Sequence, residues 1–93
     1  MLTYIQTEKL TVSTGAPANS TIANAARPIL LAVSSDVAFH ALIDLSTASP
    51  AADTNAPYFP TGNVYVFTLP AGAEISIRGA AAGSAWVSEV TQS

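Results

Sequence analysis

Residues 64–90 read VYVFTLPAGAEISIRGAAAGSAWVSEV, and this stretch decides the fold. Its side chains alternate in character, and short corners containing glycine or proline divide it into three segments. Alternation at period two is typical of strands with one buried face and one wet face. Because Pro70–Gly72 has the residues of a three-residue hairpin loop, and 80–83 forms a second small corner, we predict a C-terminal three-stranded antiparallel meander.

The hairpin register predicts one buried surface for this meander. If Leu69 and Ala73 flank the loop, large residues of the first two strands fall on the same side. The same alternation, carried through the second corner, adds two residues of the last strand. The surface predicted in this way consists of Tyr65, Phe67, Leu69, Ile75, Ile77, Trp86 and Val90. We expect the indole N–H of Trp86 to donate to a nearby carbonyl.

The rest of the chain also favours strands. Ile29–Ser34 is an apolar run suited to a central strand, and Val37–Leu45 alternates with Phe39 on its apolar side. Leu2–Val12 alternates less regularly, so we interpret residues 1–26 either as an extended arm or as beginning with an edge strand. Residues 46–63 form a long loop that contains three prolines. A short helix at 21–26 competes with a loop there, because Ser20 could cap it.

Composition indicates one small domain that works by contact. The 93 residues contain no cysteine, which excludes disulfides, and only 10% are charged, against about 25% in typical proteins. A domain of this size often depends on association for stability. We therefore predict a single all-β domain over 1–93, a small antiparallel β-sandwich or jelly-roll-like barrel, that forms a homo-oligomer.

Charge and patterning exclude several classes of function. A net charge of −3 with three scattered cations argues against nucleic acid. No apolar run reaches the roughly 20 residues of a membrane helix, and the N-terminal pattern is not that of a signal peptide, so we expect no membrane partner and synthesis in a cytoplasm.

No residue pattern predicts chemistry. His40 shares a strand face with Asp36 and Asp44, but four residues along a strand span about 13 Å, too far for a hydrogen-bonded dyad. Asp53–Asn55 lacks the other ligands of a calcium loop and fits an Asx-turn. We predict no enzyme, and no catalytic, cofactor or metal site.

Candidate contact residues lie at apolar positions in exposed segments. Tyr58 and Phe59 stand between two prolines that hold the backbone extended. Three interpretations stay open: the rings cap one end of the core, anchor a partner, or form a ligand platform. Together with Tyr4 and Ile22, they are the interface residues we predict.

The chain resembles a known class of proteins. Its small, acidic, cysteine-free composition, its N-terminal segment rich in Ala, Ser and Thr, and the segments Pro57–Gly62, Leu69–Gly72 and Gly83–Ser88 are similar in style to small virion proteins of tailed bacteriophages. The likeness is to the cement or decoration type. It implies a β-sandwich or jelly-roll, trimeric or dimeric, that sits on the capsid surface and clamps junctions of the major capsid protein.

A second function from a different class stays open. A fibre or spike component, or a lectin-like binding module, would use Tyr58, Phe59 and Asn55 to stack on and hydrogen-bond a surface glycan.

Overall fold

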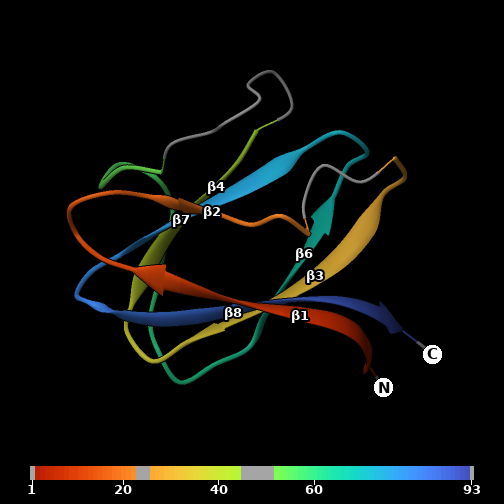
Figure 1. The fold of residues 1–93 in the computed structure, drawn as a ribbon, viewed down its shortest axis with the longest axis horizontal. Helices are drawn as coiled ribbons and strands as arrows, with labels where there is room; N and C mark the ends of the chain where they lie inside the picture. Colours follow the sequence, from red (N-terminus) through yellow and green to blue (C-terminus); the bar gives the residue numbers. More distant parts are fainter. Residues whose placement is uncertain (1, 23–25, 45–51, 93) are drawn as a thin grey trace.

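The computed structural model describes residues 2–22, 26–44 and 52–92, and within these ranges the chain forms eight β-strands and no helix (Figure 1). Accordingly, none of the described residues belongs to a helix that could cross a membrane. The strands are β1 (Leu2–Val12), β2 (Ala18–Asn19), β3 (Ile29–Ser35), β4 (Phe39–Asp44), β5 (Tyr58–Phe59), β6 (Tyr65–Leu69), β7 (Glu74–Gly79) and β8 (Gly83–Gln92).

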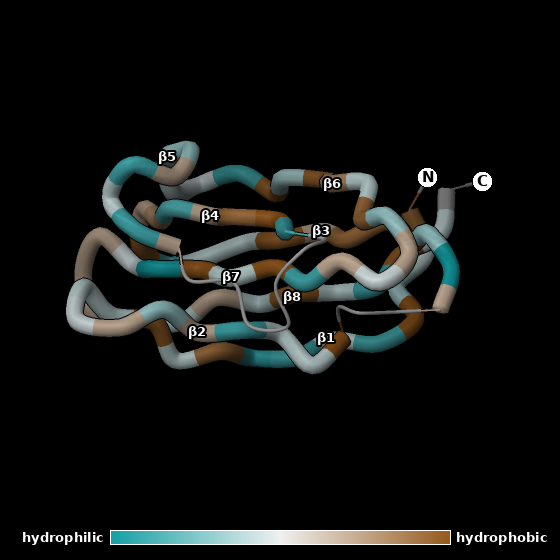
Figure 2. The backbone as a smooth tube through the Cα atoms, turned by 90° about the horizontal axis from the view of Figure 1, so that it is seen from above, coloured by the Kyte–Doolittle hydropathy of each residue, from teal (hydrophilic) through white to brown (hydrophobic). Residues whose placement is uncertain are grey.

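The strands form two antiparallel four-stranded sheets. The first sheet has the order β1-β8-β3-β6 and the second has the order β2-β7-β4-β5. Figure 2 looks onto the sheets and shows their strands in matching order, from β5 and β6 at the top to β2 and β1 at the bottom. The pairs β1–β8, β2–β7, β3–β6 and β4–β5 nest inside one another along the chain. Eight strands in this nested order make a jelly roll, so the predicted all-β sandwich is confirmed.

The predicted C-terminal meander is wrong, because β6, β7 and β8 alternate between the two sheets. Gly72 does take a positive φ of 81°, and the N–H of Ala73 donates to the carbonyl of Pro70 at 3.0 Å. This turn passes the chain from one sheet to the other instead of closing a hairpin. A proline and a glycine suit a turn that closes a hairpin and a turn that connects two sheets equally well. The partner of β6 in its sheet is β3, with Ile29 opposite Leu69.

The change of sheet at each corner also changes the face on which two predicted buried residues lie. Leu69, Ile75 and Ile77 are fully buried in the core as predicted, and Tyr65 and Phe67 pack against it. Trp86 and Val90 instead lie on the outer face of the first sheet, since their neighbours Val87 and Glu89 pair with the inward-facing Val33 and Leu31. Val90 is nevertheless buried, at 3% exposed, as predicted. Trp86 is half-buried, with the Lys9 ammonium 6.0 Å from its ring centroid.

The strand predictions for the first half of the chain are confirmed in type. β3 and β4 occupy the predicted runs, with Phe39 fully buried and Ala41 buried on the inner face. Leu2–Val12 is an edge strand that pairs with β8 along its length, apart from an irregularity between Tyr4 and Gln6, so this part is no free arm. The predicted helix at 21–26 and the loop at 46–63 fall partly outside the described residues.

Glu8 on β1 holds the segment that follows β2. Its Oε1 accepts hydrogen bonds from the Ser20 hydroxyl at 2.7 Å and from the Thr21 N–H at 2.8 Å. Burial would raise the pKa of Glu8, but hydrogen bonds from Ser20, Thr21 and the backbone of Ile22 together outweigh it, so this pKa lies below its ordinary value. The ionised carboxylate therefore stabilises the folded chain.

The Glu8→Gln variant should be less stable than the wild type by about 1 kcal/mol at pH 7, because a neutral acceptor makes weaker hydrogen bonds. A lowered pKa means that the stabilisation is complete above the pKa of the unfolded chain and is lost as pH falls through the folded-state pKa. Urea denaturation between pH 7 and pH 3 measures this difference. A difference that stays constant or grows toward pH 3 would contradict the assignment.

Candidate interaction surface

The outer face of the second sheet is partly covered by the protein's own chain. The N–H of Ala52 donates to the Ser76 hydroxyl at 2.9 Å, and the Arg78 Nε donates to the Ala52 carbonyl at 2.7 Å. Ala52 and Ser76 are both fully buried. Arg78 also donates to the carbonyl of Thr14 at 2.7 Å, which ties two loops to this face. Arg78 therefore has a structural role at this face.

The outer face of the first sheet consists of three rows of side chains that cross all or most of its strands. The strand register defines them. The first row is Tyr4, Val90, Leu30 and Thr68, the second is Thr7, Ser88, Ala32 and Val66, and the third is Lys9, Trp86 and Ser34. We call these eleven residues the outer patch. Tyr4 and Val66, on the two edge strands, are 52% and 47% exposed, whereas Val90, Ser88 and Ala32, on the two inner strands, are buried in the single chain.

The outer patch has almost no charge. Lys9 is the one charged side chain among its residues, and none of the chain's six acidic residues belongs to it. By register, Glu8 and Glu89 lie on the opposite face of the first sheet, and Asp44 pairs with Glu74 in the second sheet. Asp36 lies at the corner after β3 and Asp53 in a turn near β5. Hydroxyl and apolar side chains make up the rest of the outer patch.

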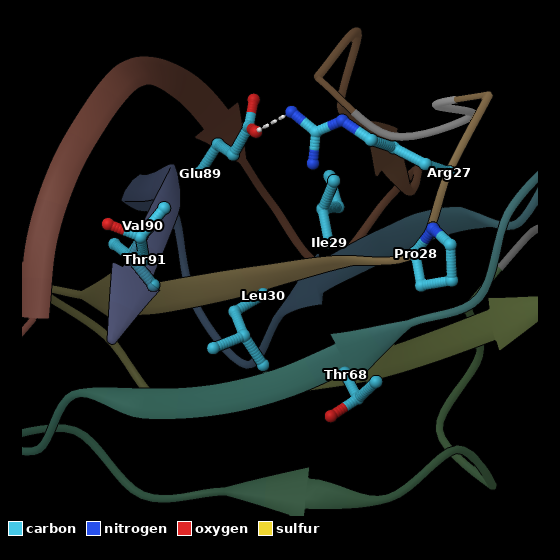
Figure 3. A pocket seen from close by; sticks show the side chains of 8 residues that line it. All are labelled: Arg27, Pro28, Ile29, Leu30, Thr68, Glu89, Val90 and Thr91. Atoms are coloured by element: carbon cyan, nitrogen blue, oxygen red, sulfur yellow. Dashed lines mark hydrogen bonds and ion pairs between the residues drawn. The ribbon is translucent and has the colours of Figure 1, made fainter. Parts of the chain in front are cut away.

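A hollow of about 340 Å³ adjoins the first row at one end of the sheet (Figure 3). Leu30, Thr68 and Val90 of the outer patch line it, together with Arg27, Pro28, Ile29, Glu89 and Thr91. In Figure 3 the Arg27 side chain reaches back to Glu89, with 3.3 Å between Nη2 and Oε2. The Glu89 carboxylate also accepts a hydrogen bond from Gln6 at 2.9 Å, so its charge is compensated despite burial.

The four predicted interface residues divide into two pairs. Tyr4 and Tyr58 are exposed, at 52% and 56%. Ile22 and Phe59 pack against the core instead. The Phe59 ring stacks on Phe39 with 5.2 Å between centroids, and contacts Tyr65 edge-on at 5.0 Å. Of the three interpretations for the aromatic pair, core capping therefore describes Phe59.

The polar residues considered for chemistry have structural partners. The Nδ1 of His40 lies 3.0 Å from the Ala56 carbonyl, and its ring contacts Tyr58 edge-on at 5.3 Å. The Asx-turn at Asp53 is confirmed, since its Oδ1 accepts hydrogen bonds from the N–H groups of Asn55 and Ala56. Within the described ranges, no three His, Asp or Glu residues gather as metal ligands would.

Sequence reasoning found Tyr4 but missed the rest of the outer patch. Alternation predicts Val90 and Trp86 on the buried surface of a meander, and it predicts a strand for Leu30 without indicating its face. No local signal in the sequence separates the two faces of β8, because the pairing of Lys9 with Trp86 joins strands from the two ends of the chain. No protein-family model, curated protein or solved structure matches this chain.

Proposed function

We propose that this protein is a non-enzymatic structural component of a virus particle, which binds as an oligomer across junctions of the major capsid protein and stabilises the capsid. The observation that supports the proposal is the outer patch, a sheet face with a single charge and with exposed Tyr4 and Val66 at its two edges. A face of this kind costs little to desolvate, and its small side chains lose little rotamer entropy on contact.

The proposed role does not need a deep pocket. An oligomer that contacts several subunits of a lattice at once gains affinity by effective concentration, so each contact can be weak. Jelly rolls occur in capsid proteins, lectins and cupins, so the fold is compatible with the role but does not select it. The resemblance to decoration proteins selects the particle as the partner.

The test is quantitative mass spectrometry of purified virus particles from the source of this sequence. We expect the protein at a high and fixed copy number relative to the major capsid protein. Particles stripped of it should regain it when the purified chain is added, and should then resist heating better. Absence from particles, or a copy number that varies between preparations, would contradict the proposal.

A glycan array, read together with the particle analysis, tests the glycan-binding alternative. Tyr58 is exposed and lies three residues after Asn55, whereas Phe59 faces the core, so a sugar would meet one ring and not two. Binding on a glycan array that Tyr58→Ala removes, combined with absence from particle heads, would replace the capsid role with this one.

A further inference from the structure

We propose that the outer patch is a dimer interface and that its occupant is the outer patch of a second copy of this chain. The inference deepens the proposed function, on which it rests for the oligomer's role, by naming the surface that makes the oligomer. The two first sheets would stack face to face, related by a two-fold axis nearly parallel to their strands. Such an isologous contact closes at two copies.

The size of the face suits a dimer. It lies on the side of the molecule that is bounded by its longest and shortest dimensions, 34 Å and 18 Å, which enclose at most roughly 600 Å² (Figure 2). Two such sides bury at most roughly 1,200 Å² in total, which is the lower limit for specific, stable interfaces. Among the described residues the second sheet offers no comparable face, because Ala52 and the Arg78 side chain lie over it.

The rows of the outer patch complement one another under this symmetry. Rotation about an axis parallel to the strands keeps each row in place and reverses the strand order, so β1 faces β6 of the second copy and β8 faces its β3. Leu30 of one copy then faces Val90 of the other, and Trp86 faces Ser34. Apolar residues meet in the first row without an opposing charge.

The hollow receives the most exposed ring of the patch. Tyr4 of one copy faces Thr68 of the other, which lines the hollow of about 340 Å³ beside Leu30 and Val90. The ring, 52% exposed in a single copy, would enter that hollow, and the symmetry makes the contact twice. Aromatic rings seated in pockets are the residues that dominate interface energies.

Charge does not oppose this arrangement. Lys9 is on β1, so it faces the β6 side of the second copy and not the other Lys9. The two ammonium groups stay about three strand spacings apart, or about 14 Å. No carboxylate belongs to either patch. Glu89 lines the adjoining hollow, where Arg27 pairs with it at 3.3 Å.

The absence of cysteine allows a direct test by disulfide cross-linking. In a Tyr4→Cys/Thr68→Cys double variant the two thiols of one chain stand three strands apart, too far to bond to each other. Across the proposed interface, the thiol at position 4 of each copy faces the thiol at position 68 of the other copy, so two disulfides can form. Oxidation should therefore yield a covalent dimer from the double variant, whereas Tyr4→Cys alone and Thr68→Cys alone should stay uncrosslinked.

Solution measurements on the wild type provide a second test. Light scattering should give twice the chain mass of 9.5 kDa, and dilution to monomer should shift the emission of Trp86, the only tryptophan, toward longer wavelength. Val66→Lys should raise the dissociation constant at least about tenfold by placing unpaired charge in the contact. The matched control is Tyr58→Lys, which changes a similarly exposed residue on the second sheet and should leave dimerisation unchanged.

Several outcomes would overturn the dimer. They are a wild type that is monomeric or trimeric, a dimer that persists in Val66→Lys, Trp86 emission that ignores dilution, and no disulfide in the folded double variant. Circular dichroism establishes that each variant is folded. A monomeric wild type that is still found on particles contradicts the dimer and leaves the capsid role intact. A dimer that is absent from particles supports the interface and contradicts the capsid role.

Discussion

Phe39→Ala should lower the free energy of unfolding by about 3–5 kcal/mol, the largest loss that we expect from a single substitution. The Phe39 ring is fully buried where the two sheets meet, stacked on Phe59 and in edge contact with Tyr65 at 5.9 Å. Its removal leaves a cavity between a core strand of the second sheet and the edge strands of both sheets. Small domains are stable by only about 5–15 kcal/mol in total, so the substitution should remove at least about a fifth of the protein's stability.

Urea denaturation followed by circular dichroism measures this loss. Tyr58→Ala is the matched control, because it removes a neighbouring ring that is 56% exposed and should change stability by less than about 1 kcal/mol. If Phe39→Ala cannot be isolated folded, Phe39→Leu should fold and lose about 1–2 kcal/mol. Equal losses for Phe39→Ala and Tyr58→Ala would contradict the described packing.

Gly79→Ala should cost about 2–3 kcal/mol, although it adds a single methyl group. Gly79 is buried at the end of β7, and its N–H donates to the Ser13 carbonyl at 3.1 Å. An added Cβ would lie 2.5 Å from the carbonyl oxygen of Ala81 and 3.0 Å from the Val12 side chain. The first of these neighbours is backbone, so the corner between the two sheets must shift to admit the methyl group.

Thermal and urea unfolding of Gly79→Ala should both show the loss. Gly15→Ala is the control: an added Cβ there would meet no atom nearer than 4.0 Å, so the substitution should change stability by less than about 0.5 kcal/mol. A Gly79→Ala variant as stable as Gly15→Ala would mean that the corner is looser than described.

The sequence predicts the elements of this fold better than their partners. Alternation located β3, β4 and β6–β8, and the turn chemistry of Pro70–Gly72 predicted the positive φ of Gly72. Neither signal says whether a corner closes a hairpin or passes to the other sheet. That choice depends on contacts between distant strands, such as β3 with β6 and β1 with β8.

The same ambiguity prevented prediction of the candidate surface from the sequence. In β8 the face of each residue follows from its pairing with β1 and β3, so an assumed hairpin with β7 reversed the positions of Trp86 and Val90. The outer patch draws on four strands that are spread over nearly the whole chain. Its polar and apolar residues share no local pattern, so only the register brings them together.

Nested pairing also affects how this protein folds. Leu2 pairs with Gln92, whereas the innermost pair joins Phe39 to Phe59, so loop-closure entropy favours pairing from the middle of the chain outward. During synthesis β1 leaves the ribosome first and gains its partner β8 last. Contacts across such long sequence separations make folding slow, on the scale of milliseconds to seconds, and the nascent β1 exposes its backbone throughout.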